Sequence, residues 1–440
     1  MMSNKWKSLI IQAEKLLGGP APFINLSSLL TSEVEFLASR ARRLAGTVDH
    51  PFFSAVRACF QGRSGNYPFL PLALKSFGPA NRGNLTQRAP GGLIILLAGQ
   101  CSAGNLGKSS VKLSNQYRKL AEVFETVHLA VTIHKSLVDP SSLKHISTSG
   151  NSGSNEVNGR SLVKDWEAGN KVATLVGDVL LASVSTTLAE FRNTQVLDVV
   201  SESIGNMFEA EFLPFAMNFS HGSSACPDQL GLSTDQAADQ WLNYIGLSHG
   251  SLLGSCCQAT LLLAGTSDKK QSGSHVVHGL GYNWALLLRL LEEREFVHHI
   301  WANKTKYVSS TSFLNANTAV FPPRHRVLNY INNGLPEPTL LDAVMTQQLT
   351  TESAETRLTD VVTTALLPQH ASPIFNAYDQ LGQKLANNLS QVFDEFSAIS
   401  QATRERASSS ALNVLGEMIH QLSAEACLQL TPVVKVMSDS

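Results

Sequence analysis

The chain has 440 residues, of which 43% are hydrophobic and only 16% charged, and its formal net charge is -1. Proteins that bind nucleic acid through surface charge usually carry a basic domain or stripe, so this composition argues against that class. Ordinary soluble domains are about a quarter charged. So low a charged fraction indicates either a large core or an extensive apolar subunit interface, and composition does not decide between them.

The first eighteen residues have the spacing of a helix. Their apolar positions, three or four residues apart, include Trp6, Leu9, Ile10 and Leu16. The segment lacks arginine and contains Glu14, which is unlike an organelle presequence, so we expect the first helix of the fold. No unbroken run of eighteen apolar residues follows anywhere, which predicts that no segment spans a membrane.

The six cysteines are scattered and show no Cys-x-x-Cys spacing. Neither a zinc ribbon nor a redox motif is therefore indicated, and the pattern fits a reducing compartment. Cys256 and Cys257 lie in an apolar stretch, where we expect them to be small buried hydrophobic residues.

Helical periodicity dominates the rest of the chain. Apolar residues recur at three- and four-residue steps in 124–138, 172–180, 252–264 and 282–291. These patterns predict an all-α fold with one large helical domain over residues 5–430. The Ser-, Gly- and Asn-rich stretch 147–159 is expected to be a mobile insertion, and 431–440 a flexible C-terminal tail.

Residues 125–139 read ETVHLAVTIHKSLVD. This segment resembles the first signature of trans-prenyl diphosphate synthases, in which a helix leads into Asp-Asp-x-x-Asp. The resemblance implies a site where aspartates hold Mg²⁺ ions that clamp an allylic diphosphate. Here Lys135 and Ser136 take the two leading places, and only Asp139 is acidic. Lys135 shares a helix face with Asp139, so we expect it to pair with that carboxylate or to be an ordinary solvated lysine.

A second segment, 169–182, closely resembles the Asn-Lys-x-Ala-x-Leu-x-Gly-Asp-x-Leu-Leu-Ala stretch of the same family. Gly177 is expected to let another helix approach closely, at some cost in helix propensity. Asn170, Lys171 and Asp178 match the motif as well. We expect these residues to serve folding, with a role at the diphosphate site as the alternative.

The second acidic signature of the family would fall within 281–296. Matching acid to acid places Glu292 and Glu293 at its leading positions and Phe296 at the last. Aligning the motif on Gly281 instead leaves Glu292 as its only acidic residue, at the last position. The motif is degenerate in both registers, and an ordinary charged helix end is the alternative interpretation.

Two basic elements of catalytic relatives are also missing. Residues 248–252 read Ser-His-Gly-Ser-Leu where those relatives carry Lys-Thr-Ala-x-Leu, and we expect His249 to be structural. A Gly-Lys-Arg-x-Arg-Pro cluster is replaced by Ala89-Pro90-Gly91-Gly92. No arginine fork for phosphate is therefore evident in either place.

Together with residues 12–18, 28–34 and 43–47, this pattern resembles the second, non-catalytic subunit of heteromeric all-trans-polyprenyl (decaprenyl or solanesyl) diphosphate synthases. The resemblance implies a helical bundle of the trans-prenyl synthase type and a heterotetramer with a catalytic subunit. It further implies that Mg²⁺ binds in that partner, that the product is the isoprenoid tail of ubiquinone, and that the location is mitochondrial. We predict no catalytic residue and no metal ligand in this chain.

Two alternatives stay open at this point. The chain could be a self-sufficient prenyltransferase with a degraded metal site that uses Asp139, Glu292 and Glu293. It could instead be an isoprenoid-binding scaffold with a different partner.

Overall fold

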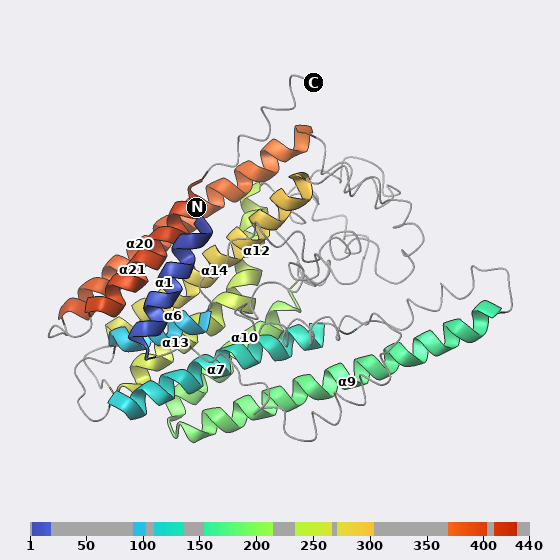
Figure 1. Ribbon diagram of the computed structural model, residues 1–440, viewed down its shortest axis with the longest axis horizontal. Helices are drawn as coiled ribbons and strands as arrows, with labels where there is room; N and C mark the ends of the chain where they lie inside the picture. The colour runs from blue at the N-terminus through green and yellow to red at the C-terminus, as the bar shows by residue number, and fades with distance from the viewer. Residues whose placement is uncertain are drawn as a thin grey trace.

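The computed structural model of the chain describes residues 2–18, 91–102, 110–135, 137, 154–213, 234–265, 271–302, 368–402 and 409–428. All elements within these residues are helical (Figure 1). They are, in order, α1 (Met2–Leu16), α6 (Gly91–Ser102), α7 (Ser110–Lys135), α9 (Ser154–Glu190), α10 (Thr194–Ala210), α12 (Thr234–Ile245), the π-helix η5 (Gly246–Gly250), α13 (Ser251–Leu263), α14 (Gln271–Ala302), α20 (Pro368–Ala402) and α21 (Ser409–Ala426). The predicted all-α fold class is confirmed over these residues.

The centre of the bundle is α6. Its sequence GGLIILLAGQCS contains no charge, and residues 91–99 are all buried. A helix that is apolar on every side can lie only inside a core. Helices α7, α13 and α21 pack around it. One large core cluster thus accounts for part of the apolar composition.

The helix predicted for the first eighteen residues is confirmed as α1, which packs into the bundle. It lies beside the C-terminal helix α21, far from α1 in sequence (Figure 1). The buried indole of Trp6 donates to Glu425 Oε1 at 2.6 Å. Its ring meets the edge of Trp284 on α14, with centroids 6.3 Å apart. The N-terminal helix α1 is therefore held against both α14 and the C-terminal helix α21.

Helix α14 crosses η5 and α13 at small residues. A Cβ on Gly281 would lie 2.6 Å from the carbonyl oxygen of Leu253, and one on Gly250 would lie 2.8 Å from the ring of Tyr282. Larger side chains would force the helices apart. In the same crossing Cys256 and Cys257 are fully buried, as predicted, and burial raises the pKa of both thiols.

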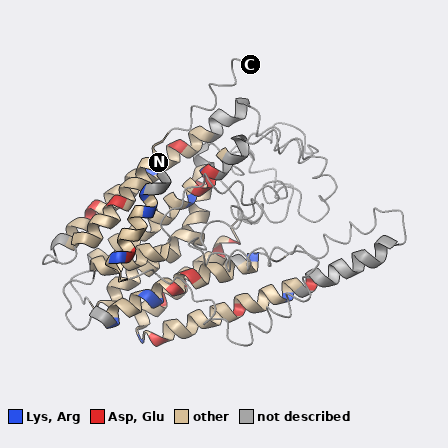
Figure 2. Cartoon of the chain, viewed as in Figure 1, with Lys and Arg blue, Asp and Glu red and all other residues tan. Residues whose placement is uncertain are grey.

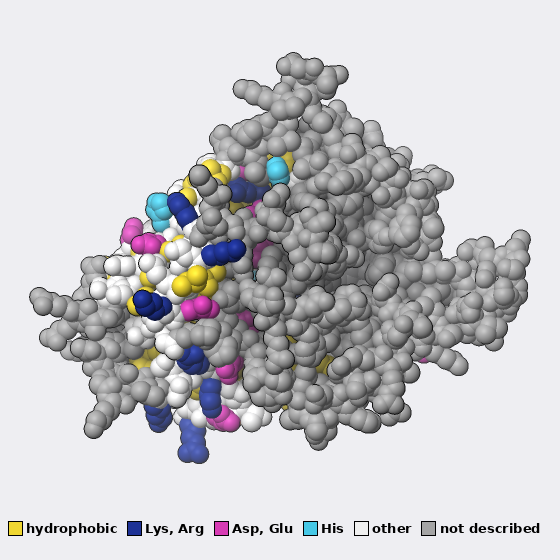
Figure 3. Space-filling view, in the orientation of Figure 1, with side chains coloured by type: hydrophobic (Ala, Val, Ile, Leu, Met, Phe, Trp, Pro, Cys, Tyr) yellow, Lys and Arg dark blue, Asp and Glu magenta, His cyan; other side chains and the backbone are white. Residues whose placement is uncertain are grey.

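Charges are sparse over the described helices (Figure 2). Among the coloured side chains of the face shown in Figure 3, acidic and basic residues are interspersed and do not gather into a patch of one sign. The described part of that face therefore shows no basic patch of the kind that attracts a polyanion.

Helix α9 runs along α7 at the edge of the bundle opposite α20 and α21 (Figure 1). Its segment Gly169–Glu190 is long and apolar enough, by length and composition alone, to cross a membrane. It is not an unbroken apolar run, because Thr, Ser, Gly and Asp interrupt it. Its inner face packs on α7, as in a core helix, so the segment is weak support for a membrane span.

The predicted insertion 147–159 lies partly outside the described residues. Helix α9 begins inside this range, at Ser154. The boundaries 5–430 of the helical domain stay a prediction, and the predicted tail 431–440 lies outside the described residues.

Candidate functional site

Lys135, the last residue of α7, forms an ion pair with a carboxylate that the sequence did not suggest. Its Nζ lies 2.8 Å from Glu211 Oε1, just after the end of α10. The Lys135 side chain is only 12% exposed, and that of Glu211 is 34% exposed. A pair this sheltered is weakly screened by water, so it holds the ends of α7 and α10 together.

Tyr244 on α12 completes this cluster. Its hydroxyl donates to Glu211 Oε1 at 3.0 Å, and Lys135 Nζ donates to the same hydroxyl at 3.4 Å. The ammonium also lies 5.9 Å from the centroid of the Tyr244 ring, within reach of a cation–π attraction. Tyr244 itself is fully buried. We call Lys135, Glu211 and Tyr244 the lysine triad.

The lysine triad does not fit a Mg²⁺ ion. Mg²⁺ requires several oxygen ligands in near-octahedral geometry, usually carboxylates and phosphates. Here an ammonium already neutralises the carboxylate of Glu211 and would repel a second cation. The two other residues of the first degenerate motif, Ser136 and Asp139, lie outside the described residues.

The second degenerate motif is buried in packing contacts. Glu293 on α14 is 1% exposed and accepts hydrogen bonds from the Trp241 indole, at 3.0 Å, and from the Tyr378 hydroxyl. Glu292 lies 3.8 Å from Arg289 in an ion pair on the same helix. Both glutamates are thus bound by side chains of the protein. Their carboxylates have different partners and do not form a pair directed at one metal ion.

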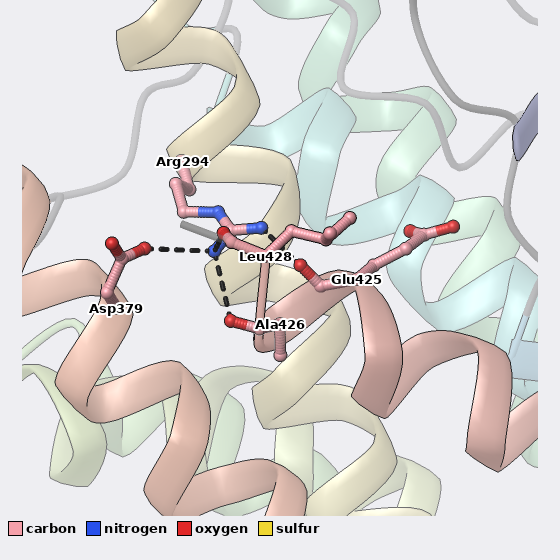
Figure 4. A network of polar contacts seen from close by, with 5 residues as sticks. All are labelled: Arg294, Asp379, Glu425, Ala426 and Leu428. Carbon is pink, nitrogen blue, oxygen red and sulfur yellow. Dashed lines mark hydrogen bonds and ion pairs between the residues drawn. The ribbon is translucent and has the colours of Figure 1, made fainter. Parts of the chain in front are cut away.

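Arg294, the next residue of α14, anchors the C-terminal helices (Figure 4). Its guanidinium donates to the carbonyl oxygens of Glu425 at 2.6 Å, Ala426 at 3.2 Å and Leu428 at 3.4 Å. It also forms an ion pair with Asp379 of α20 at 3.2 Å. The last carbonyls of a helix have no partner within the helix, so this arginine caps α21.

Helix α12 lies between the two degenerate motifs. Trp241 binds Glu293, and Tyr244, one turn further along α12, binds Glu211 and Lys135. Residues three apart on a helix share a face. Two buried aromatic side chains on one helix therefore link the remnants of both acidic signatures.

The second segment brings α9 against α7. A Cβ on Gly177 would lie 2.1 Å from His134 Nε2, so any larger residue here would force the His134 ring to move. His134 Nε2 lies 3.4 Å from Asp178 Oδ1 and 3.3 Å from the carbonyl oxygen of Thr174. Asn170 is half-buried and Lys171 exposed on the same helix. These positions are those of a helix–helix contact.

A buried carboxyl group lies at the start of α6. Glu125 is fully buried, and its Oε1 accepts the backbone N–H of Gly92 at 3.1 Å. Burial raises the pKa of Glu125 well above its ordinary range. Nearby, the rings of His128 and His249 lie 5.6 Å apart, and both side chains are half-buried. Gly92 lies in the segment that the resemblance led us to expect in place of a basic cluster, and its N–H contacts an acid.

Sequence reasoning missed the partners of Lys135 and Glu293. They are Glu211 and Tyr244 for Lys135, and Trp241 and Tyr378 for Glu293. None belongs to a recognised motif. A buried tryptophan and tyrosine three residues apart on one helix are the local signal that could have indicated polar partners, because buried Trp and Tyr usually find one. Within the described residues, no group of three or more His, Cys, Asp or Glu side chains is arranged to hold a metal ion.

Comparisons with known proteins place these observations in context. No family model matches the chain. It is 30% identical over 263 residues to All trans-polyprenyl-diphosphate synthase PDSS2 of Mus musculus, which covers 59% of this chain and 56% of that protein. It is 23% identical over 323 residues to the probable mitochondrial hexaprenyl pyrophosphate synthase of Yarrowia lipolytica, 66% of each. The chain spans little more than half the length of the PDSS2 relatives.

Solved structures similar to the chain include a medium/long-chain prenyl pyrophosphate synthase of Arabidopsis, with a TM-score of 0.44 and 16% identity over 91% of this chain and 98% of that one. Another is a geranylgeranyl pyrophosphate synthetase of Pyrococcus horikoshii, with a TM-score of 0.45 and 11% identity over 94% and 98%. The similarity in sequence supports the resemblance to subunit 2 of the all-trans-polyprenyl synthases.

Proposed function

We propose that this chain is a non-catalytic or regulatory subunit of a heteromeric all-trans-polyprenyl diphosphate synthase. It stabilises a catalytic subunit, which binds the Mg²⁺, and the assembly makes the isoprenoid side chain of ubiquinone. The names of its relatives support a polyprenyl synthase, and the similarity extends to both PDSS2 and PDSS1. A mitochondrial location is proposed because three fungal relatives are named as mitochondrial.

The observation that carries the proposal is the lysine triad. Polyprenyl transfer needs metal ions to neutralise the leaving diphosphate as the allylic cation develops. In this chain Lys135 places a positive charge where the first acidic signature begins, and Glu211 and Tyr244 hold it there. Neither degenerate motif, as described, offers a free cluster of carboxylates, which favours a subunit that leaves the chemistry to its partner.

A subunit without catalytic activity would act by stabilising the assembly. Burial of Glu293 against Trp241 and Tyr378, and the cap that Arg294 forms on α21, turn the second signature into a structural junction. A rigid helical body of this kind can stabilise a homologous partner by burying part of its surface. We propose a heterotetramer as the assembly.

The test is co-expression with a catalytic synthase subunit, with the chain carrying an affinity tag. The proposal expects co-purification, a higher melting temperature of the catalytic subunit in the complex, and polyprenyl product from the complex. Glu292→Gln in this chain should leave that activity unchanged, because the carboxylate of Glu292 is already paired with Arg289 on the same helix. Loss of product in the Glu292→Gln complex, with the complex intact, would support a degraded but working metal site instead.

A further inference from the structure

The π-helix η5 joins α12 to α13 without a break in the helical backbone. Ile245, just before η5, and Ser251, just after it, both have right-handed helical φ and ψ angles. A π turn holds one residue more than an α turn, and such turns are rare and occur mostly at functional sites. The π turn therefore sets how α12 is rotated about its own axis relative to α13.

Two features make the described conformer of η5 costly. It begins with Gly246 and ends with Gly250, and glycine has a low helix propensity. Ser248, between them, is 2% exposed, and its hydroxyl has no hydrogen-bond partner within the described residues. A buried hydroxyl without a partner costs free energy. Contacts outside η5 must therefore offset this cost.

Tyr282 of α14 is the first of these contacts, because it lies against both glycines of η5. A Cβ on Gly246 would be 2.2 Å from the Tyr282 hydroxyl oxygen, and one on Gly250 would be 2.8 Å from its ring. If the π turn rotated, a larger side chain would replace a glycine beneath the ring. Tyr282 thus blocks rotation while it stays in place, and because it is only half-buried its ring can move outward.

Helix α12 supplies the other contacts. The Trp241 indole donates to Glu293 at 3.0 Å, and the Tyr244 hydroxyl donates to Glu211 at 3.0 Å. Moving a π turn along a helix by one residue changes the rotation of the preceding helix by about 100°. No hydrogen bond tolerates so large a change. Since α12 carries both donors on one face, a single rotation removes both bonds.

We propose that α12 and η5 form a conformational switch. In the closed state, which the structure describes, Tyr282 covers the two glycines and α12 keeps both hydrogen bonds. In the open state the π turn has moved along the helix, α12 is rotated, and both bonds are lost together. The contacts of α12 favour the closed state and the buried Ser248 hydroxyl favours the open one. We expect an open population on the order of 1%.

The switch couples the two degenerate motifs. Lys135 and Glu211 hold Tyr244, whereas Glu293 holds Trp241 one turn away on the same helix. Coupling between separate sites requires a two-state element whose equilibrium both sites bias, and α12 with η5 is that element. Weakening the lysine triad should therefore release Trp241. This inference goes beyond the proposed function and needs no partner subunit.

The first experiment is fluorine NMR of the isolated full chain, in which all five tryptophans are replaced by fluorotryptophan. Loss of one signal in Trp241→Phe assigns the Trp241 resonance. Lys135→Met should raise the ratio of open to closed Trp241 signals roughly tenfold, because it removes one of the contacts that hold α12. The matched control is Lys119→Met on the same helix, which breaks only an exposed ion pair and should leave the Trp241 signal unchanged.

The second experiment acts on η5 directly. Gly250→Ala sets a methyl group against the Tyr282 ring and should increase the same open signal that Lys135→Met increases. Ser248→Ala removes the buried hydroxyl and should decrease that signal. Gly273→Ala on α14 is the control, since the nearest side-chain atom to its Cβ position is 3.7 Å away. If Gly250→Ala fails to fold, Ser248→Ala and Lys135→Met still test the switch, with opposite signs.

Three results would overturn the proposal. One is a Trp241 signal that Lys135→Met leaves as it is in the wild type. Another is a different new signal in Lys135→Met and in Gly250→Ala, which would indicate local repacking at each place. The third is an equal effect of Lys119→Met, which would indicate general loss of stability. None of these measurements uses a catalytic subunit or an activity, so failure of the switch is separate from failure of the proposed function.

Discussion

The ammonium of Lys135 lies 2.8 Å from the carboxylate of Glu211, although α9 and α10 separate the two residues along the chain. This contact joins the end of α7 to the end of α10 at the place where the first acidic signature begins. It neutralises a carboxylate with a fixed cation of the protein, so the local charge balance needs no metal ion.

The first prediction concerns the strength of this pair. In a double-mutant cycle with Lys135→Met and Glu211→Gln, we expect a coupling energy of about 1–2 kcal/mol, because the pair is partly sheltered from water. Glutamine keeps an acceptor for the Tyr244 hydroxyl. Urea unfolding of the four proteins measures the coupling.

The control is the ion pair of Lys119 and Glu190 at 2.5 Å, whose side chains are 47% and 54% exposed. Its coupling should stay below about 1 kcal/mol. Equal coupling in the two cycles, or additive effects of Lys135→Met and Glu211→Gln, would show that the Lys135 pair has no special role.

The second prediction concerns the crossing of α7 and α9. Gly177→Ala should destabilise the protein by about 1–3 kcal/mol, because the new methyl group would overlap the ring of His134. Gly205→Ala on α10 is the matched control. No atom lies within 4 Å of its Cβ position, so it should stabilise the helix by about 0.5–1 kcal/mol. Thermal unfolding measures the change in stability of each variant. A change of the same sign in Gly177→Ala and Gly205→Ala would contradict the close approach of α7 and α9 at Gly177.

The third prediction concerns pH. Burial raises the pKa of Glu125 in the folded state above its unfolded value. Between these two values the folded state holds one more proton than the unfolded state, so stability falls as pH rises. Glu125→Gln removes this titration. The variant should therefore gain stability relative to the wild type as pH increases from the ordinary range of glutamate toward neutrality.

Denaturant unfolding at a series of pH values measures this difference. Glutamine retains the acceptor for the Gly92 N–H, so packing at the start of α6 is kept. A stability difference that is constant with pH would contradict burial of the Glu125 carboxyl.

The fourth prediction concerns the C-terminal anchor. Arg294→Met should cost about 3–5 kcal/mol, because it removes the sheltered ion pair with Asp379 and the hydrogen bonds to three carbonyl groups at and just beyond the end of α21. Arg294→Lys should recover part of this loss, since lysine can pair with Asp379 but cannot span the carbonyls. Amide hydrogen exchange at the end of α21 should be faster in Arg294→Lys than in the wild type, and fastest in Arg294→Met. Lys384→Met, at an exposed position of α20, should leave it unchanged.

Helix positions could be predicted from the sequence because they depend on local spacing. The apolar steps in 124–138 and 172–180 gave α7 and α9, and those in 252–264 and 282–291 gave α13 and α14. The small residue Gly177 also indicated a close helix contact, and the structure places His134 there.

The partners of the degenerate motifs could not be predicted, because they are long-range contacts with no local signature. Sequence spacing suggested Asp139 as the partner of Lys135, whereas the described contact is with Glu211. Likewise, Glu293 was weighed as a metal ligand or a helix end, and its burial against Trp241 and Tyr378 depends on helices far along the chain.

The most direct test of a non-catalytic role is a condensation assay with the purified chain alone. Isopentenyl diphosphate, an allylic diphosphate primer and Mg²⁺ are supplied, and polyprenyl product is measured with and without a catalytic subunit. The lysine triad predicts no product from the chain alone and product once the catalytic subunit is added. Polyprenyl diphosphate made by the isolated chain in the presence of Mg²⁺ would contradict it.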